Sequence, residues 1–563
     1  MGDVMNAMPF GRLMNHILEE YKRHHTIFNV SKVVNCTTNH HLPLMGDQIE
    51  NPIGPAAGPH TQLAQNIVAC YAAGGRFIEL KTIQQVYGQD LKIPRPCINS
   101  RDETYNVEWS SEFSPEKAME EYIKAWYVLK LISKEFKLGD PDAFVFDMSV
   151  GYNLEGIKSK MVDAFIEGLK NAENTPIWKE CEEWSLNNLS KFQHIDDTYL
   201  GQISSKVSHS VTLSTMHGCP ADEIEVIAGY LIEEKKLDTC IKCNPTLLGY
   251  DDVRKTLDEM GYDYIEVDDE QFKIDLQFDQ AVSMLTRLQE KAKALDFNLG
   301  VKLSNTLPVK INQNELPGDQ MYMSGKSLYP LTIAVAEKMS KAFDGKMPIS
   351  YSGGIDKNNV EKIFNCGIWP ITFCAVLLKG AGLDQMAVIS DRLTGLSTVA
   401  ERRIDIKNIQ EIVSKVTKDK NYIKSEAART KYDKSPSFTN QRGEGIFCKT
   451  LCKHCVRTCP NRANEIVAFS DTKLIVHIDG SCNECGNCSC GCIEPCQPYT
   501  DRLTFFENET DFHNSRNQGF CQLEGRWLVR WENTESQAVL GSLPEPIKGV
   551  VVAFKNQHPY YLK

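Results

Sequence analysis

Short apolar runs alternate with longer amphipathic stretches through most of the chain. Eight runs read as buried strands, at residues 51–57, 76–80, 144–150, 211–215, 239–243, 299–304, 348–352 and 371–376. Segments between them, such as 116–132, 221–236 and 278–295, carry apolar residues at helical spacing. Strand followed by helix, repeated about eight times over roughly 350 residues, predicts an α/β fold of the (β/α)8 TIM-barrel type, although a doubly wound sheet would give a similar pattern.

The same pattern predicts five regions. We expect an N-terminal helical extension at 1–49, whose helix over 10–23 caps the barrel bottom, and then the barrel at 50–400. A polar, basic helical linker follows at 401–447. A small α+β domain at 448–510 and a C-terminal extension at 511–563 complete the chain.

The composition limits the classes of protein to which the chain can belong. The 563 residues carry 62 basic and 74 acidic side chains, a formal charge of −12, with 42% hydrophobic residues. This is an ordinary soluble composition, and the acidic balance argues against a nucleic-acid partner. No apolar run approaches the roughly 18 residues of a membrane span, and the first residues lack a signal-peptide profile. We expect a cytoplasmic protein that binds neither nucleic acid nor membrane.

Cysteines are concentrated in one segment. Of 20 in the chain, ten lie between Cys448 and Cys496, and a cytoplasmic location argues against disulfides. Two runs there follow the bacterial ferredoxin spacing, in which three close thiolates hold one [4Fe–4S] cluster and the fourth crosses to the other cluster. The predicted ligand sets are Cys448, Cys452, Cys455 and Cys492 for one cluster, and Cys459, Cys482, Cys485 and Cys488 for the other.

Two features of these runs leave alternatives open. The first run begins with three intervening residues rather than two, and Cys496 is a possible replacement for Cys492. Structural zinc and a single cluster are the competing interpretations, although eight cysteines exceed what one tetrahedral zinc site needs.

Polar and small residues stand at the predicted strand ends, where TIM barrels gather their chemistry. They are Ala57, Gly58, Lys81, Thr82, Asn153, His217, Cys219, Lys242, Asn305, Thr306, Gly353, Gly354, Cys374 and Ala375. Alone, Gly353-Gly354 would read as a turn, but after the seventh strand its bare amides suit a phosphate. The lysines, amides and hydroxyls suit flat polar rings, such as a flavin stacked on a ring substrate.

The sequence around these residues resembles that of a known enzyme family. The segments NPIGPAAGPHTQLAQNIVACYAAGGRFIELKT, SVGYNLEGI, IKCNPT, LSNT and PISYSGGI…GIWPITFCA resemble, in order, the FMN barrel of dihydropyrimidine and dihydroorotate dehydrogenases. With the cysteine segment included, the chain resembles more closely the so-called selenate reductase subunits of the YgfK type. Members usually carry an internal FAD/NAD(P)H domain, but no G-x-G-x-x-G follows a strand here. The resemblance therefore implies a separate FAD/NAD(P)H flavoprotein, or another redox protein, as partner.

The resemblance also implies roles for individual residues. Ala57, Gly58, Lys81, Thr82 and Asn153 would contact the FMN ring, Lys242 would lie near its N1, and Gly325, Gly353, Gly354, Cys374 and Ala375 would hold its phosphate. Asn153, Asn305 and Thr306 would bind the substrate. Cys219 falls where dihydropyrimidine dehydrogenases place the catalytic acid, and a thiol of pKa about 8.5 is protonated near neutrality. His217, two residues away, is the alternative acid.

We therefore expect an FMN- and [4Fe–4S]-dependent oxidoreductase, similar to dihydropyrimidine dehydrogenase. Electrons would pass between two [4Fe–4S] clusters and FMN to reduce or oxidise a C=C or C=N bond of a small pyrimidine- or purine-related heterocycle. The alternative is a non-catalytic electron-transfer adapter of a larger complex, for example with a molybdenum hydroxylase. A lid at 307–323 that blocks the site would favour the adapter. Selenate reduction is disfavoured because the strand ends offer no arginine.

Overall fold

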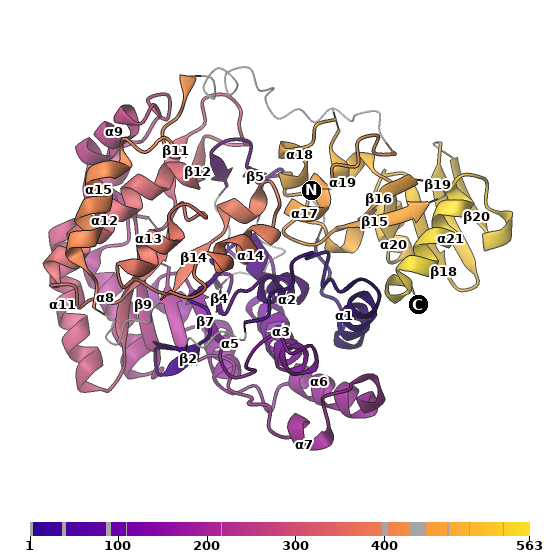
Figure 1. Ribbon diagram of the computed structural model, residues 1–563, viewed down its shortest axis with the longest axis horizontal. Helices are drawn as coiled ribbons and strands as arrows, with labels where there is room; N and C mark the ends of the chain where they lie inside the picture. The colour runs from indigo at the N-terminus through magenta and orange to yellow at the C-terminus, as the bar shows by residue number, and fades with distance from the viewer. Residues whose placement is uncertain are drawn as a thin grey trace.

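Eight parallel strands form a nearly closed barrel in the order β3-β14-β13-β10-β9-β8-β7-β4 (Figure 1). The computed structural model describes all residues except 1–3, 37–40, 86–91, 108–109, 215–216, 397–402, 427–445, 470–471, 495, 533 and 563. The strands are β3 (Ile53–Pro55), β4 (Phe77–Glu79), β7 (Val145–Val150), β8 (Ser210–Leu213), β9 (Asp238–Cys243), β10 (Leu299–Leu303), β13 (Ile349–Ser352) and β14 (Ile371–Phe373). Between β3 and β4, the Arg76 amide donates to the Ile53 carbonyl at 2.9 Å. The predicted TIM barrel is confirmed.

Helices surround the barrel (Figure 1). They include α2 (Ala64–Ala72), α3 (Pro115–Glu135), α5 (Lys160–Lys170), α8 (Ala221–Glu233), α11 (Phe278–Ala294), α12 (Tyr329–Ala342), α13 (Val360–Asn365) and α14 (Asp384–Asp391). The long helix α3 begins after Ser114, whose side chain accepts from the Lys117 amide, and has Pro115 in its first turn. Within the predicted linker, α15 (Ile406–Val416) packs against α12 and so belongs to this helical layer. Residues 401–402 and 427–445 of that linker lie outside the described residues.

A second sheet contributes to the mouth of the barrel. It has the order β11-β12-β6-β5, built from β5 (Ile98–Asn99), β6 (Thr104–Asn106), β11 (Leu307–Lys310) and β12 (Gln320–Ser324). The segment expected to be a lid loop at 307–323 is therefore largely a β-hairpin. The Pro, Gly and Asn residues on which that expectation rested lie mainly in its turn, whereas the flanking residues supply buried apolar side chains such as Val309 and Met323.

The C-terminal region is built on a six-stranded sheet. Its strands, in sheet order, are β15 (Asn464–Phe469), β16 (Thr472–Ile478), β17 (Thr504–Phe506), β18 (Gly519–Leu523), β19 (Arg526–Trp531) and β20 (Thr534–Ala538). Helix α21 (Ile547–Gln557) packs on β15, and Phe505, Phe520 and Phe554 share one core. Because β17 pairs with β18, the regions predicted separately on the two sides of residue 510 share a sheet.

The N-terminal helix α1 (Phe10–His24) bridges the two halves of the molecule (Figure 1). It packs on α6 (Pro176–Asn187) of the barrel, and Arg12 forms an ion pair with Glu507 of the C-terminal region at 2.9 Å. The expectation that this helix caps the barrel bottom is wrong. The hairpin of β1 (Leu42–Leu44) and β2 (Asp47–Ile49) lies there instead, and Trp369, just before β14, donates to the Pro43 carbonyl at 3.1 Å.

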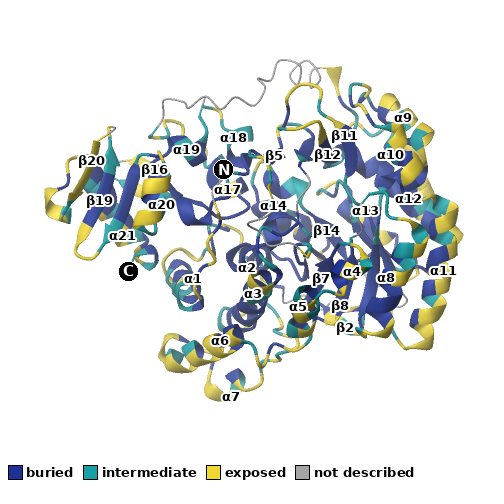
Figure 2. Cartoon of the chain, turned by 180° about the vertical axis from the view of Figure 1, so that it is seen from behind, coloured by how far each residue is buried: buried dark blue, intermediate teal, exposed yellow. Residues whose placement is uncertain are grey.

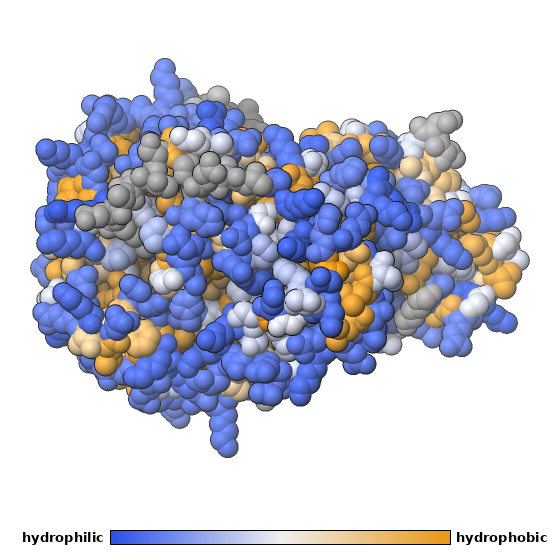
Figure 3. All heavy atoms as spheres, turned by 60° about the horizontal axis from the view of Figure 1, so that its bottom comes forward, coloured by the Kyte–Doolittle hydropathy of each residue, from blue (hydrophilic) through white to orange (hydrophobic). Residues whose placement is uncertain are grey.

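The buried residues lie mainly in the sheets and in the helix faces that pack on them. The barrel strands and the inner faces of the surrounding helices are buried, whereas the outer helix faces are exposed (Figure 2). The face shown in Figure 3 is mostly hydrophilic, with hydrophobic residues in small separate patches. Among the described residues, no helix is both long and apolar enough to cross a membrane.

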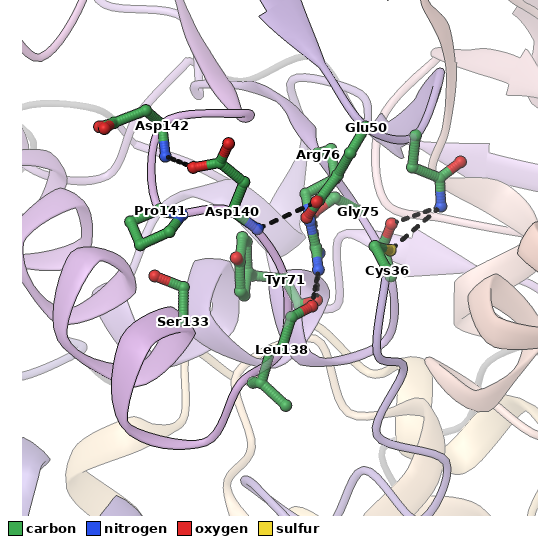
Figure 4. A network of polar contacts seen from close by, with 12 residues as sticks. Cys36, Glu50, Tyr71, Gly75, Arg76, Ser133, Leu138, Asp140, Pro141 and Asp142 are labelled. Atoms are coloured by element: carbon green, nitrogen blue, oxygen red, sulfur yellow. Dashed lines mark hydrogen bonds and ion pairs between the residues drawn. The ribbon is translucent and has the colours of Figure 1, made fainter. Parts of the chain in front are cut away.

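A fully buried arginine fixes the lower end of the barrel (Figure 4). Arg76, directly before β4, pairs with Glu50 at 2.6 Å and donates to the carbonyls of Tyr71, Gly75 and Leu138 at 3.0, 3.0 and 2.6 Å. Glu50 also accepts from the Asp140 amide at 3.0 Å. A buried guanidinium with this many partners ties the start of β4 to the segments before it and to the loop that precedes β7.

Replacing Arg76 with Met should therefore destabilise the protein strongly. An unpaired buried carboxylate costs about 3–5 kcal/mol of unfolding free energy, measurable by denaturant unfolding. Lys415→Met breaks an ion pair that is 70% and 65% exposed and should cost less than about 1 kcal/mol. The double variant Glu50→Gln/Arg76→Met should recover part of the loss. A loss in Arg76→Met no larger than in Lys415→Met would contradict this assignment.

Candidate functional site

A cavity of about 310 Å³ opens at the carboxyl ends of the barrel strands. The mouth sheet contributes Thr104, Asn106, Tyr322 and Ser324 to its wall. Most residues predicted for the site line it, namely Ala57, Gly58, Lys81, Thr82, His217, Lys242, Asn305, Thr306, Gly325, Gly353, Gly354, Cys374 and Ala375. The barrel thus brings together side chains that are spread over more than 300 positions of the sequence.

Two predicted residues lie elsewhere. Asn153 is exposed, and its side-chain oxygen accepts from the Gly156 amide at 2.9 Å, so it caps the short helix α4 (Leu154–Ile157). Cys219 is half-buried but does not line the cavity. Burial, together with Glu223 and Asp222, raises the pKa of its thiol to about 12. Of the two residues predicted as the catalytic acid, only His217 faces the cavity.

His217 is held by a buried carboxylate. Its Nδ1 lies 2.9 Å from Oδ2 of Asp275, whose side chain is 1% exposed. The Gly218 amide and the Thr246 hydroxyl also donate to Asp275, both at 2.7 Å. Although burial opposes it, these bonds keep the pKa of Asp275 below its usual value. An ionised Asp275 favours the tautomer with a proton on Nδ1, and that tautomer leaves Nε2 to exchange a proton with a ligand.

Two buried polar atoms on cavity-lining residues lack partners. Among the described residues, neither Nε2 of His217 nor Oγ1 of Thr104 has a hydrogen-bond partner. Buried polar groups are normally satisfied, so an orphan in a cavity wall indicates a ligand. The two belong to different structures, the loop after β8 and the mouth sheet.

Close to Thr104 the wall is made of backbone. Gly325 and Gly354 have positive φ angles of 84° and 67°, and a Cβ on Gly354 would lie 2.6 Å from the Gly325 carbonyl oxygen. Lys326 and Lys379 line the cavity as well, and burial lowers the pKa of Lys379 to about 8. Bare amides, a free hydroxyl and ammonium groups are the donor set that a phosphate requires.

Sequence reasoning missed several residues of the wall. They include Lys302, Ser304, Tyr322, Ser324, Lys326 and Lys379. Lys302 lies within the strand-like run 299–304, where a lysine reads as an outward-facing residue. Tyr322 and Ser324 lie in the hairpin that was expected to be a loop.

One cysteine set surrounds a small interior space. Cys459, Cys482, Cys485 and Cys488 line it together, and each is no more than 8% exposed. Burial raises the pKa of the Cys482 thiol, and the nearby Cys459, Cys485 and Cys488 thiols add to that shift. We call these four residues the inner set. It has the membership predicted for one cluster.

The second group, nearer to solvent, consists of Cys448, Cys452, Cys455 and Cys492, and we call it the outer set. Burial raises the pKa of the Cys455 thiol to about 12, and the neighbouring Cys492, Cys448 and Cys452 thiols contribute. Cys452 is exposed. The Sγ atom of Cys496 lies 3.7 Å from that of Cys492, so both thiols are close to this set.

No group of three or more His, Cys, Asp or Glu side chains in the described part of the chain is spaced to hold a single metal ion. In a [4Fe–4S] cluster the four thiolates bind four different irons, so they need not converge on one point.

The inner set lies behind the cavity wall and is hydrogen-bonded to it. The carbonyl of Cys485 accepts from the amides of Cys97 and Ile98 at 3.1 and 2.9 Å. Asn487 donates to the Leu378 carbonyl at 3.2 Å. Ile98 and Leu378 both line the cavity. The cysteine region is therefore joined to the cavity wall by hydrogen bonds to residues that line the cavity.

A model of one protein family covers most of the barrel half. It is described as "Oxidoreductase YgfK, N-terminal TIM-barrel domain", and it matches residues 28–424. The chain belongs to this oxidoreductase family. The match extends past residue 400 through α15, in agreement with the packing of that helix on the barrel.

Curated relatives agree with this assignment. Two proteins named "Putative oxidoreductase YgfK", from Escherichia coli strains K12 and O157:H7, are each 42% identical over 433 residues. These alignments cover 74% of this chain and 41% of each relative. The chain thus matches about two fifths of the length of these YgfK proteins.

Solved structures give only distant similarity. Two structures of dihydroorotate dehydrogenase (DHODH) from Eimeria tenella, one with ferulenol and one ligand-free, align with TM-scores of 0.38 and 0.40. Their sequence identities are 14% and 13%, and they cover 64% and 72% of this chain and 83% and 95% of their own chains.

Proposed function

We propose that this YgfK-family protein is an FMN- and iron–sulfur-dependent oxidoreductase. Electrons would pass between two [4Fe–4S] clusters and FMN, and the reaction would reduce or oxidise a C=C or C=N bond of a small pyrimidine- or purine-related ring. The observation that supports the proposal best is the hydrogen bond from the amide of Ile98, which lines the cavity, to the carbonyl of Cys485 in the inner set. This contact would hold a cluster in the inner set next to the wall of a flavin site, as electron transfer between the two would need.

The cavity residues fit FMN. The backbone of Gly325, Gly353 and Gly354, with Thr104 and Ala375, would hold its phosphate, and Lys81 and Lys242 would contact the polar edge of its ring. When bound, FMN would supply hydride transfer and the exchange of two electrons for single-electron steps. The two cysteine sets fit two [4Fe–4S] clusters, because each offers four thiols that lie close together.

The chain's own residues would orient the ring and move a proton. Asn305 and Thr306 line the cavity, and Asn305 donates to Asn244 at 3.1 Å. We assign the proton-transfer role to His217, since its Nε2 is unpartnered among the described residues and Asp275 holds its Nδ1. In the direction of reduction, Nε2 donates a proton to the ring atom next to the one that receives the hydride.

The adapter alternative is less well supported by this geometry. The hairpin at 307–323 frames a cavity rather than filling it, and a candidate proton donor faces that cavity. The exposed Cys452 in the outer set is consistent with electron exchange with a separate FAD/NAD(P)H flavoprotein or another redox protein.

The proposal is tested on protein purified without oxygen. We expect about one FMN and about eight irons per chain, as two [4Fe–4S] clusters require. The reduced protein is then mixed with uracil, orotate, xanthine or urate, and the oxidised protein is mixed with dihydrouracil, which can only donate electrons. Reoxidation of the flavin by one of the first four rings, or its reduction by dihydrouracil, supports the enzyme. FMN and iron without either reaction would favour the adapter, and the absence of FMN would refute the proposal.

Substitution of His217 separates the two candidate acids. His217→Asn should lower turnover by about 10²–10⁴-fold, the usual contribution of a general acid, while FMN and iron contents stay unchanged. Cys219→Ala should have a much smaller effect. Asp275→Asn should lower turnover and alter its pH profile, because His217 would lose its fixed proton. A large loss in Cys219→Ala with little change in His217→Asn would return the role to the thiol.

Iron analysis tests the two cysteine sets. Cys482→Ala in the inner set and Cys452→Ala in the outer set should each remove about half of the iron, since each disrupts one cluster of four irons. Cys521→Ala is the matched control, because Cys521 is buried in β18 outside both sets. Unchanged iron in both set variants would contradict the assignment.

A further inference from the structure

An ion pair crosses the interior of the barrel below the cavity. It joins Lys302 of β10 to Glu79 of β4, and these side chains are 2% and 1% exposed. In the barrel order, three strands separate β4 from β10 on either side. The two side chains therefore come from opposite walls and meet near the barrel axis. Lys302 also lines the cavity.

Stability does not explain this pair. The free energy needed to remove two charges from water can equal or exceed the free energy gained from their attraction. Apolar residues of similar size therefore often stabilise a core equally well. The pair is also incompletely satisfied. Among the described residues, Oε1 of Glu79 has no partner, and Glu79 is the only hydrogen-bond partner of Lys302. An ammonium group has three donors, so Lys302 retains two for a ligand in the cavity.

A second lysine stands beside the first. Lys242 of β9 and Lys302 of β10 are paired in register on adjacent parallel strands, and both line the cavity. Like charges in such positions repel. Glu79 offsets one of the two charges, which allows both ammonium groups to face the same ligand.

Another buried acid near this pair, Asp147, carries only part of a negative charge. Asp147 on β7 accepts from the hydroxyls of Ser210 and Thr212, both at 2.6 Å. Burial raises the pKa of Asp147 to about 7, so near neutrality it is only partly ionised. On the strands themselves the barrel floor thus carries Lys242, Lys302, Glu79 and this partly ionised aspartate, and Lys81 lines the cavity just beyond β4.

The lysine pair faces the ring end of the site. The phosphate-type donors, Gly325, Gly354 and Thr104, belong to loops after the strands and to the mouth sheet, whereas Lys302 lies within its strand, two residues before Ser304. A ligand with its phosphate among the glycines would place its ring system over the floor.

We propose that Lys302, positioned by Glu79, acts with Lys242 to stabilise the negative charge that the FMN ring acquires on reduction, and so raises its midpoint potential. This inference rests on the proposed function, since it requires FMN in the cavity. Lys302 adds positive charge below the ring, and Glu79 both orients that charge and partly cancels it. Substitutions of the two partners should therefore change the potential in opposite directions.

The test is the midpoint potential of bound FMN, measured by anaerobic spectroelectrochemistry on the holoprotein. Lys302→Met should lower the potential because a positive charge is lost. Glu79→Gln should raise it, because a negative charge is lost while a side chain of the same shape remains to orient Lys302. Lys302→Arg is the matched control, since it keeps the charge and should stay close to the wild-type value.

The results of this test separate a failure of the proposed function from a failure of the role assigned to the ion pair. Wild-type protein without FMN would refute the proposed function itself. FMN binding with unchanged potentials, or with Lys302→Met and Glu79→Gln shifted in the same direction, would overturn the role of the pair and leave the proposed function intact. If Lys302→Met does not fold, Lys302→Gln replaces it in the comparison with Lys302→Arg, and equal potentials in those two variants would overturn the inference.

Discussion

The carbonyl oxygen of Cys485 accepts hydrogen bonds from two successive barrel amides, those of Cys97 and Ile98. This contact fixes the inner cysteine set against the wall of the barrel cavity. The proposed electron transfer depends on it, because the rate of electron transfer falls steeply with distance and a loosely tethered domain would not hold a fixed gap. The surrounding contacts support it, with Asn483 donating to Glu112 at 2.7 Å and Ser100 donating to Asn487 at 2.7 Å.

The barrel half follows a second constraint, which is that charges buried near its axis must be compensated. Arg76 at the lower end is surrounded by one carboxylate and three carbonyls. Lys302 near the cavity has one carboxylate partner among the described residues, which leaves it further donors. In the first arrangement every guanidinium nitrogen has a partner, which stabilises the fold, whereas the second is open toward the cavity and suits a ligand. The number of partners around a buried charge thus distinguishes Arg76, which stabilises the fold, from Lys302, for which we propose a role toward a ligand.

The sequence predicted the features that depend on local spacing. Strand and helix periodicity gave the barrel, and the cysteine spacing gave two sets whose members lie together in the structure. It could not reveal contacts between strands far apart in the chain, such as Glu79 with Lys302 or His217 with Asp275. Asn153 was predicted to bind ligand because a helix-capping asparagine and a ligand-binding one look alike at a strand end. The hairpin at 307–323 was missed because its turn residues outweighed its short strands.

The route of electrons between the cysteine sets and the cavity can be followed directly. Oxidised, anaerobic holoprotein is mixed with reduced methyl viologen in a stopped-flow spectrometer, and cluster and flavin absorbance are followed separately in wild type and in Cys485→Ala. We expect the flavin to be reduced after the clusters in the wild type, and much more slowly in Cys485→Ala, although the outer cluster is still reduced. Flavin reduction at the same rate in both proteins would contradict this expectation.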